Sequence, residues 1–450
     1  MTTDKRKSQL LQALNAIDSN LVLDGNIDIE ALLSLNGDRS YQLMWSGRRK
    51  AFSTAEEKEN IALEKIRGSG RDWLIRGDNL KALKALQASH TDRVDVIIID
   101  PPYNTGKRFT YNDNFKGRDR KKGRHDDWLS MMTPRLILAR KLLVEDGCLF
   151  VHIGDDELAN LKLLLEELFG EENVLGILTW VKKKKGSHLS KSLRSITEYI
   201  VVVAKDKSKL NLYGEPAYSD KWQPLAKKTN RLKTLSFDAN TVESKLPDGE
   251  HDPKNRSGLL EFKDHIHIKA GRVSNAFSVI GPFVWTQKKL DQEIALGTKV
   301  ALSKRFGFNV FRHDQAQKFK RPITLLDKNR GIGSYEDAFE ELHQRLGVER
   351  LFTYAKPTSL LRHLIRAGSH FKPDALIMDF FAGSGSLGEA VWQTNAETGS
   401  SKRFILVQQT SPVVDERFET IADICEARLK AAQPTIDGAE LPTIWRMTDE

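Results

Sequence analysis

The chain has 450 residues, which is enough for two or three domains of ordinary size. Hydrophobic residues make up 40% of it and charged residues 29%, and its apolar runs are far shorter than the roughly 20 residues that cross a bilayer. We therefore expect a globular protein with no membrane partner. The net charge of +9 suits a polyanionic partner.

The N-terminus and the two cysteines predict a cytoplasmic protein. The polar start of the chain runs into a short amphipathic helix pattern at 10–14, without the apolar stretch of a secretion signal. Cys148 lies in a strand-like run and Cys425 in a helix-like run, so the two cannot form a disulfide framework or a cysteine zinc site. We expect both thiols to be buried and no metal to be bound.

Residues 1–70 are predicted to form a helical N-terminal segment, and strands alternate with helices from Trp73 onward. The predicted strands are 73–75, 94–99, 148–153, 175–181 and 199–204. The predicted helices are 79–88, 128–143 and 156–168, with Gly147 as the stop signal of the second. This alternation is typical of a parallel, doubly wound α/β sheet, and it assigns residues 71–205 to one half of that sheet.

Residues 206–350 have a different texture, with turn clusters, many lysines and arginines, and scattered aromatic side chains. We interpret this stretch as an inserted domain. Its aromatic residues are explained equally well by base contacts and by a hydrophobic core. The pair His265 and His267 alternates as in a strand and is interpreted as surface rather than as metal ligands. The α/β pattern resumes over 351–450, with helices at 357–366 and 387–393, strands at 375–378 and 404–408, and a C-terminal helix after them.

The first motif that carries chemistry is Asp100-Pro101-Pro102-Tyr103, directly after the buried strand 94–99. Ligands of open parallel sheets bind at the carboxyl ends of strands. The prolines restrict the chain and leave the carbonyl of Pro101 free beside the carboxylate of Asp100, so two acceptors face one spot. They can bind both hydrogens of an aromatic amine and localise its lone pair, while Tyr103 stacks on the ring. The alternative is a rigid turn without chemistry.

The second motif is the glycine-rich turn from Asp379 to Gly388, between a predicted strand and a predicted helix. Glycines let the backbone approach a cofactor, and the helix start offers free N–H groups. Nucleotides, dinucleotides and S-adenosylmethionine all use such turns. The absence of a Lys-Ser/Thr ending disfavours a phosphate-binding loop. A third element is Asp78, which either meets the adenine of a cofactor or simply caps the helix that follows it.

Two basic segments lie next to these motifs in the predicted fold, at 116–124 and 182–191. Each could contact the phosphates of a polyanionic partner, or could be no more than a solvated loop. The candidate contact residues, which would be DNA-binding if that partner is DNA, are Arg118, Lys121, Lys122, Lys182, Lys183, Lys184 and Lys185.

Together the motifs resemble amino-methyltransferases of the permuted β group, and within it the modification subunits of type III restriction-modification systems. The resemblance covers about half of the chain, from Tyr41 to Ala204 and from Lys356 to Gln408. The segments that carry it, in the group's order, are Gly77-Asp-Asn-Leu-Lys-Ala-Leu83, Ile99-Asp-Pro-Pro-Tyr-Asn-Thr-Gly106, Trp128-Leu-Ser-Met-Met-Thr-Pro-Arg-Leu136, 143–156 and Phe381-Ala-Gly-Ser-Gly385.

The resemblance implies a doubly wound, Rossmann-like methyltransferase sheet that uses S-adenosylmethionine, with 206–350 as an inserted target-recognition domain. Asp100, Pro101, Pro102 and Tyr103 become the candidate catalytic residues. Aspartate at the head of that motif usually marks adenine, whereas serine often marks the cytosine amine. The candidate cofactor-binding residues are Asp78, Lys356, Pro357, Asp379, Phe381, Ala382, Gly383, Ser384 and Gly385.

The resemblance also implies the substrate and the partners. Double-stranded DNA is the expected substrate, with the target base flipped out of the helix, and the protein is expected to be bacterial or phage-encoded and nucleoid-associated. A homodimer and a restriction subunit with nuclease and helicase activity are further candidate partners. The alternatives are an RNA or protein-glutamine methyltransferase and a non-catalytic DNA specificity subunit.

The sequence departs from the family pattern in two respects. The strand that ends at Val407 is followed by Gln408-Gln409-Thr410, and the nearest acid is Asp415, so the ribose contact is unassigned. The chain also looks shorter than a typical type III modification subunit, which leaves it open whether the protein acts alone.

Overall fold

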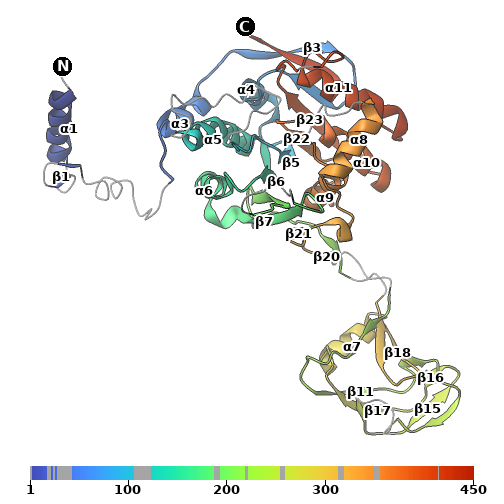
Figure 1. Cartoon of the computed structure of the whole chain (residues 1–450). Helices are drawn as coiled ribbons and strands as arrows, with labels where there is room; N and C mark the ends of the chain where they lie inside the picture. Colours follow the sequence, from blue (N-terminus) through green and yellow to red (C-terminus); the bar gives the residue numbers. More distant parts are fainter. Residues whose placement is uncertain are drawn as a thin grey trace. The chain divides into compact units, whose positions relative to one another are not determined.

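The computed structural model (Figure 1) describes most of the chain and divides it into two units. The described residues are 3–17, 22–23, 26–27, 43–105, 123–186, 193–217, 221–253, 259–312, 319–347, 355–413 and 415–449. Unit 1 comprises 1–212 and 323–450, and unit 2 comprises Tyr213–Pro322. No helix in the described ranges is long and apolar enough to cross a membrane.

Unit 1 is built on a ten-stranded sheet with the order β21-β7-β8-β6-β5-β22-β23-β4-β24-β3. The strands are β3 (Ile61–Arg67), β4 (Trp73–Arg76), β5 (Val94–Ile99), β6 (Leu143–Ile153), β7 (Val174–Val181), β8 (Thr197–Ala204), β21 (Leu325–Leu326), β22 (Leu376–Asp379), β23 (Arg403–Gln408) and β24 (Thr443–Asp449). All neighbouring pairs from β6 to β24 run parallel, whereas β8 is antiparallel to both of its neighbours. The predicted doubly wound α/β sheet is confirmed.

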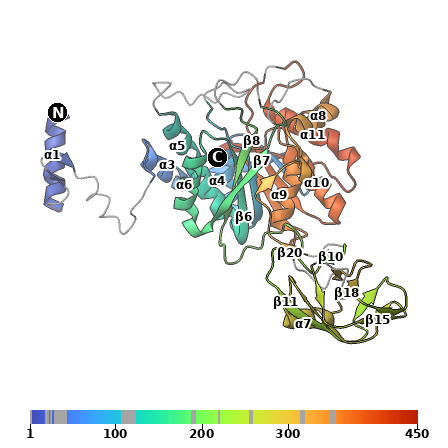
Figure 2. The same cartoon turned by 60° about the horizontal axis from the view of Figure 1, so that its bottom comes forward.

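Helices cover both faces of this sheet, because the side chains of its strands alternate between two apolar faces. Ile97 and Ile99 of β5 pack in one core cluster, while Val96 and Ile98 pack in the other. The first face carries α3 (Arg48–Glu56), α4 (Asn79–His90), α5 (Arg124–Leu142) and α6 (Leu158–Phe169). The second carries α9 (Thr358–Ser369), α10 (Ser386–Thr398) and α11 (Ile421–Ala432), and α8 (Tyr335–Leu346) packs on α11. Figure 2 shows α5 and α6 on one side of β6 and α9 and α10 on the other.

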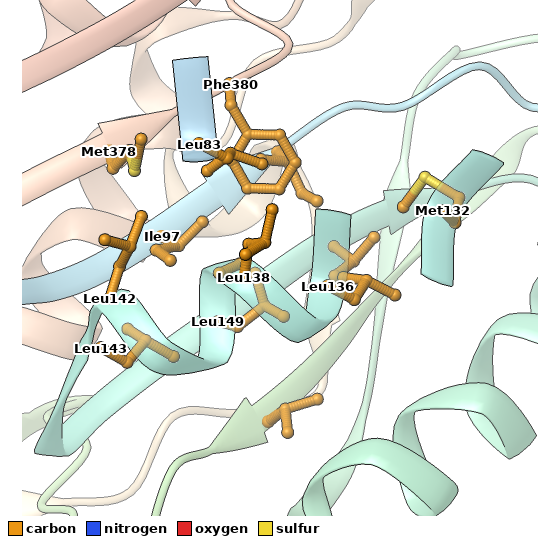
Figure 3. Close-up of a cluster of buried hydrophobic side chains, with 14 of the residues drawn as sticks. Leu83, Ile97, Met132, Leu136, Leu138, Leu142, Leu143, Leu149, Met378 and Phe380 are labelled. Atoms are coloured by element: carbon orange, nitrogen blue, oxygen red, sulfur yellow. The ribbon is translucent and has the colours of Figure 1, made fainter. Parts of the chain in front are cut away.

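The first core cluster joins the two halves of the sheet that the insert separates in sequence. Figure 3 shows Met378 and Phe380 from the second half beside Leu83 and Ile97 from the first. All four side chains are fully buried. Each is worth roughly 1.5–3 kcal/mol of transfer free energy, so this shared core holds the two halves together.

Three predictions for unit 1 need correction. Residues 1–70 are not purely helical: besides α1 (Thr3–Ile17) and α3 they form the short pair β1 (Val22–Leu23) and β2 (Asn26–Ile27), and β3. The expected C-terminal helix, α11, is followed by β24, which pairs with β3 and β4. Gly147 does not end a helix: α5 ends at Leu142, and Gly147 lies inside β6, where an added Cβ would come within 2.9 Å of the Val144 carbonyl oxygen.

Unit 2 has an aromatic core between short strands. Its strands are β9 (Glu215–Pro216), β10 (Gln223–Pro224), β11 (Lys233–Phe237), β12 (Val242–Ser244), β13 (Gly249–His251), β14 (Glu261–Phe262), β15 (Ile266–Lys269), β16 (Arg272–Val273), β17 (Phe277–Gly281), β18 (Lys299–Leu302), β19 (Phe308–Phe311) and β20 (Phe319–Lys320). Seven form one sheet, three form another, and α7 (Gln287–Ala295) is its helix in the described residues. The ring of Phe237 stacks on those of Phe277 and Phe308, with ring centroids 5.0 and 4.9 Å apart. These aromatic residues therefore belong to the core.

The structure gives unit 2 narrower bounds than the expected 206–350. Its first and last strands, β9 and β20, pair with each other where the chain enters and leaves the unit. Residues beyond Pro322 rejoin unit 1: β21 extends the large sheet beside β7. Tyr335, at the start of α8, packs in the second core cluster of unit 1.

Candidate functional site

The two motifs come together because β5 and β22 are neighbours in the sheet. Met378 lies opposite Ile97 in this parallel pair, so Asp100 and Asp379 leave the sheet at the same edge although 279 positions separate them. In the sheet, β5 has β6 as its other neighbour, and β22 has β23 as its other neighbour, so the strand order reverses between β5 and β22. Such a switch point is where open α/β sheets bind ligands.

Asp100 carries one paired oxygen and one unpaired oxygen. Its Oδ2 accepts a hydrogen bond from Lys356 Nζ at 2.6 Å. Its Oδ1 is buried and has no hydrogen-bond partner among the described residues. A buried acceptor without a partner is costly in a folded protein, and at a sheet edge it is well suited to a ligand donor.

Tyr103 is held by a buried carboxylate that the sequence motifs do not include. Its hydroxyl donates to Glu198 Oε2 at 3.1 Å, and Tyr335 donates to the same oxygen at 2.7 Å. Burial, followed by the nearby charges of Asp100 and Glu198, raises the pKa of Tyr103 well above its usual value, so the phenol stays protonated. A Cβ added to Gly154 would lie 3.0 Å from the tyrosine ring, which shows how closely the ring packs there.

The loop after Asp100 is anchored on both sides of Tyr103. Trp128 Nε1 donates to the carbonyl of Pro102 at 2.6 Å. Asn104 adopts a left-handed conformation with φ of 54°, which asparagine tolerates better than most residues. Its amide donates to the buried Glu157 and, at 2.9 Å, to the carbonyl of Arg124. The loop is therefore positioned before any ligand binds.

The glycine-rich turn is held from inside the protein. The Phe381 N–H donates to Asp379 Oδ1 at 2.8 Å, and the Gly383 N–H donates to Gln408 Oε1 at 2.6 Å. Gly383 and Gly385 have φ of 54° and 79°, in the left-handed region that favours glycine. Burial raises the pKa of Asp379 to about 8, with the Asp100 charge adding to the rise and Lys356 opposing it.

Some of the predicted cofactor residues have internal contacts. Ala382 is buried, and the Ser384 hydroxyl accepts from the fully buried Arg428 at 3.3 Å. Pro357 stands at the N-cap of α9, directly after the buried Lys356. Gln408, which stands where a ribose carboxylate was expected, holds the turn through Gly383.

Asp78 caps α4, which is one of the two roles predicted for it. Its Oδ1 accepts from the backbone N–H groups of Leu80 and Lys81 at 2.9 and 3.0 Å. Its neighbour Asn79 donates to the Phe380 carbonyl at 2.7 Å, which ties this helix start to the glycine-rich turn. The Oδ2 of Asp78 lies 3.6 Å from Arg135 Nη2, and the side chain is 50% exposed, so the carboxylate is both paired within the protein and open to solvent.

Of the predicted DNA-binding residues, the structure describes the four lysines at 182–185. Arg118, Lys121 and Lys122 lie outside the described residues. Lys182 turns inward, with its Nζ 3.2 Å from Glu198 Oε1, while Lys184 and Lys185 are exposed and Lys183 is half-buried.

The two histidines singled out in the sequence, His265 and His267, lie at the surface of unit 2. His265 contacts Glu250, and His267 is exposed. Within the described ranges no group of three or more His, Cys, Asp or Glu side chains is arranged to hold a metal ion.

Sequence reasoning missed Glu198, Tyr335 and Trp180. Lys356 Nζ lies 5.3 Å from the ring centroids of Tyr103 and Tyr335 and 5.9 Å from that of Trp180, so aromatic faces surround the ammonium. For Glu198 the one available signal was an acidic residue directly before the predicted apolar strand 199–204. Tyr335 carried no such signal, because its stretch has the texture of the insert.

Comparisons with known proteins identify the family to which the chain is similar. The DNA methylase family model (N6_N4_Mtase) matches residues 94–411. The chain is 30% identical to the type III restriction-modification enzyme EcoPI Mod subunit of Escherichia phage P1, over 89% of this chain and 70% of that protein. It is also 30% identical to the StyLTI Mod subunit of Salmonella typhimurium, over 86% and 62%. The type II methyltransferase M.KpnI of Klebsiella pneumoniae is 27% identical, over 78% and 85%. The chain thus spans about two thirds of the length of the type III relatives.

Proposed function

The chain belongs to the DNA methylase family, and from that premise we propose that it methylates the N6 amine of adenine in double-stranded DNA, with S-adenosylmethionine as the methyl donor. The observation that carries the proposal is the buried, unpartnered Asp100 Oδ1 at the sheet edge that the glycine-rich turn shares. An acceptor in that position suits the N–H of a flipped base.

The residues at this edge fit S-adenosylmethionine. The left-handed glycines at 383 and 385 let the backbone turn tightly at this edge, and an added Cβ at Gly385 would lie 2.9 Å from Cys425 Sγ. Asp379 and the half-exposed carboxylate of Asp78, which also pairs with Arg135, supply acceptors for a ligand with ammonium and adenine amine groups. When bound, this cofactor supplies an electrophilic methyl group on a sulfonium.

The chain's own residues activate the acceptor nitrogen. Asp100 Oδ1 accepts one N–H of the amine and the Pro101 carbonyl accepts the other, which draws the lone pair out of the ring system. Tyr103 stacks on the base. The amine nitrogen gains the methyl group and loses one proton to solvent. Pro102, whose carbonyl is bonded to Trp128, holds the loop rather than the base.

Unit 2 is proposed as the part that recognises the DNA sequence. It contains 20 lysines and arginines against 12 aspartates and glutamates, whereas the rest of the chain has 50 against 49. Nearly all of the net positive charge therefore belongs to these 110 residues. Lysine and arginine side chains that contact phosphates position a protein on the duplex, and these contacts help to offset the few kcal/mol that base flipping costs.

The relatives support a role in restriction and modification. Two of them are named as Mod subunits of type III enzymes, and one as a type II methyltransferase. We propose that the chain is a modification component that binds duplex DNA. A restriction subunit and a second copy of the chain are the partners to test, by copurification and by light scattering.

The experiment is methylation of plasmid DNA with labelled S-adenosylmethionine, followed by mapping of the modified bases. We expect label on adenine within one short sequence. Asp100→Ala should lower the rate at least about 1,000-fold while DNA binding stays within a few-fold of wild type. Label on cytosine, on tRNA or on protein glutamine would overturn the assignment.

A further inference from the structure

We infer that Glu198, which no motif of the sequence includes, is the positioning residue that fixes Tyr103 and Lys356 for methyl transfer. The inference rests on the proposed function, because it concerns how the base platform and Asp100 are held. It adds a residue from β8, a strand that carries neither the catalytic motif nor the glycine-rich turn.

Glu198 reaches the site because β8 runs against its neighbours. Ile153 at the end of β6 lies opposite Tyr199, and Trp180 of β7 lies opposite Glu198. The first residues of β8 therefore lie at the same sheet edge as the carboxyl ends of β5 and β6. Glu198 is only 4% exposed there, although it is charged. A carboxylate is rarely buried to this degree unless it is well paired.

The partners of Glu198 account for its burial. Oε2 accepts hydrogen bonds from the hydroxyls of Tyr335 and Tyr103, and it lies 3.9 Å from Lys356 Nζ. Oε1 lies 3.2 Å from Lys182 Nζ. One side chain thus joins two phenols and two ammonium groups that come from four separate segments of the chain.

For Tyr103 the consequence is a fixed ring plane. The hydroxyl is tethered at Glu198, one ring edge packs on Gly154, and the Lys356 ammonium lies 5.3 Å from the ring centroid. Stacking on a base needs a platform whose orientation is set before the base arrives. A neutral amide at position 198 is a weaker acceptor for the two hydroxyls that share one Glu198 oxygen, so the ring can tilt.

For Lys356 the consequence is a balanced charge. Its ammonium lies among two carboxylates, Asp100 at 2.6 Å and Glu198 at 3.9 Å, and 3.3 Å from the Tyr335 hydroxyl. With Glu198 neutral, Asp100 is the carboxylate that still pairs with Lys356 Nζ among the described residues. The ammonium then draws more of the Asp100 charge to itself, which weakens the hydrogen bond that activates the amine.

The test compares Glu198→Gln and Tyr335→Phe with a buried carboxyl outside the site. Asp72→Asn is the matched control: Asp72 is 3% exposed and accepts from Trp392 Nε1 at 2.8 Å and from the Phe404 N–H at 3.0 Å. It precedes β4, at the amino ends of the parallel strands and so opposite the site. The measurements are the single-turnover methylation rate, the dissociation constants of DNA and cofactor, and the melting temperature.

We expect Glu198→Gln to lower the single-turnover rate about 30- to 100-fold, while both dissociation constants stay within about threefold. Tyr335→Phe should lower the rate about 3- to 10-fold, because Glu198 keeps its other partners. A duplex with 2-aminopurine at the mapped adenine should fluoresce more strongly with Glu198→Gln than with wild type, since a tilted Tyr103 quenches the flipped base less. Asp72→Asn should leave rate and fluorescence unchanged.

The outcomes separate this inference from the proposed function. If the wild-type protein methylates DNA and the Glu198→Gln variant does so at the same single-turnover rate, the inference is overturned and the proposed function is not. A variant in which rate, both affinities and melting temperature fall together has the same consequence, since that indicates a purely structural residue. Wild-type protein that transfers no methyl group to DNA overturns the proposed function, and this inference falls with it.

Discussion

The two units differ in how they present charge where each is proposed to meet its ligand. Unit 1 buries charge at the catalytic edge of its sheet, where Lys356 and Glu198 are each no more than 5% exposed. Unit 2 fills its core with phenylalanines and carries its cations on its surface, as at Lys227, Lys228 and Arg231. Buried charges are expensive and are found where they shift reactivity. Exposed cations suit a polyanion that is bound from outside.

This contrast predicts a separation of kinetic effects. Changes at the buried edge of unit 1 should lower the rate of methyl transfer and leave the DNA affinity in place. Changes at the surface of unit 2 should weaken DNA binding and leave the rate at saturating DNA in place. Variants of each kind test whether the two effects separate.

The largest effect is expected for Lys356→Met. The substitution removes the cation that pairs with Asp100 and lies between three aromatic rings, and breaking a buried pair costs about 3–5 kcal/mol. We expect the single-turnover rate to fall at least about 100-fold, with the melting temperature lowered and DNA affinity within a few-fold. Rapid-quench methylation assays measure the rate, thermal melts measure the melting temperature, and a DNA titration measures the affinity.

Lys372→Met is the matched control for that variant. Lys372 pairs with Asp95 at 2.8 Å and Asp146 at 2.6 Å, and Asp95 lies on the same strand as the residues that lead into Asp100, five positions before it. We expect a lower melting temperature and a nearly unchanged rate. If both variants lose rate equally, the loss in Lys356→Met comes from a less stable fold and not from a change at the catalytic site.

Much of unit 1 could be predicted because its signals are local. The run 94–99 is apolar almost throughout, so it is typical of a buried strand, and the next residue, Asp100, then has to lie at the sheet edge. The same reasoning located Asp379 at the end of β22. Regular alternation of strands and helices was sufficient to predict the sheet and its glycine-rich turn.

The remainder depended on contacts between distant residues. Within the run of four lysines at 182–185 the sequence offers no distinction, yet Lys182 pairs inward because the β7–β8 register places Glu198 opposite Trp180. Tyr335 meets Glu198 across 137 positions, and β3 pairs with β24 across nearly the whole chain. No local periodicity encodes such pairings, which follow from the packing of the completed sheet.

An intermediate effect is expected from neutralising unit 2. Lys227, Lys228 and Arg231 are all exposed and lie on the segment that leads into β11. If all three contact phosphates, replacing them with glutamine should weaken DNA binding by roughly 10- to 50-fold at moderate salt. The slope of log K against log salt should become shallower by about 0.9 for each phosphate that is no longer neutralised. The rate at saturating DNA should not change.

The control for this triple variant carries the same change of charge in unit 1. Arg93, Lys141 and Lys207 are exposed near the amino end of β5, the end of α5 and the end of β8, which lie away from the catalytic edge. Replacing these three with glutamine should change the affinity and the salt slope much less. Equal weakening by both triple variants would show that net charge alone, rather than the surface of unit 2, governs binding.

The smallest predicted effect is a pH dependence of cofactor binding. Asp379 is mostly protonated at a pH of about 6.5 and ionised above its pKa of about 8. If its carboxylate meets the cofactor ammonium, binding favours the ionised form and releases a proton, so affinity should rise by up to about tenfold per pH unit below that pKa and level off above it. Calorimetry in buffers of different ionisation enthalpy measures the affinity and the proton released.

Asp379→Asn removes the titrating group and supplies the test of that assignment. Its cofactor affinity should be nearly flat between about pH 6.5 and 8.5. In the free protein the raised pKa acts in the other direction: the unfolded chain ionises this carboxyl near 3.8, so its contribution to stability is lost as pH rises toward 8. Asp379→Asn should therefore also flatten the fall in melting temperature over that range. A pH-dependent affinity that persists in the variant would assign the proton to another group and take Asp379 out of the cofactor site.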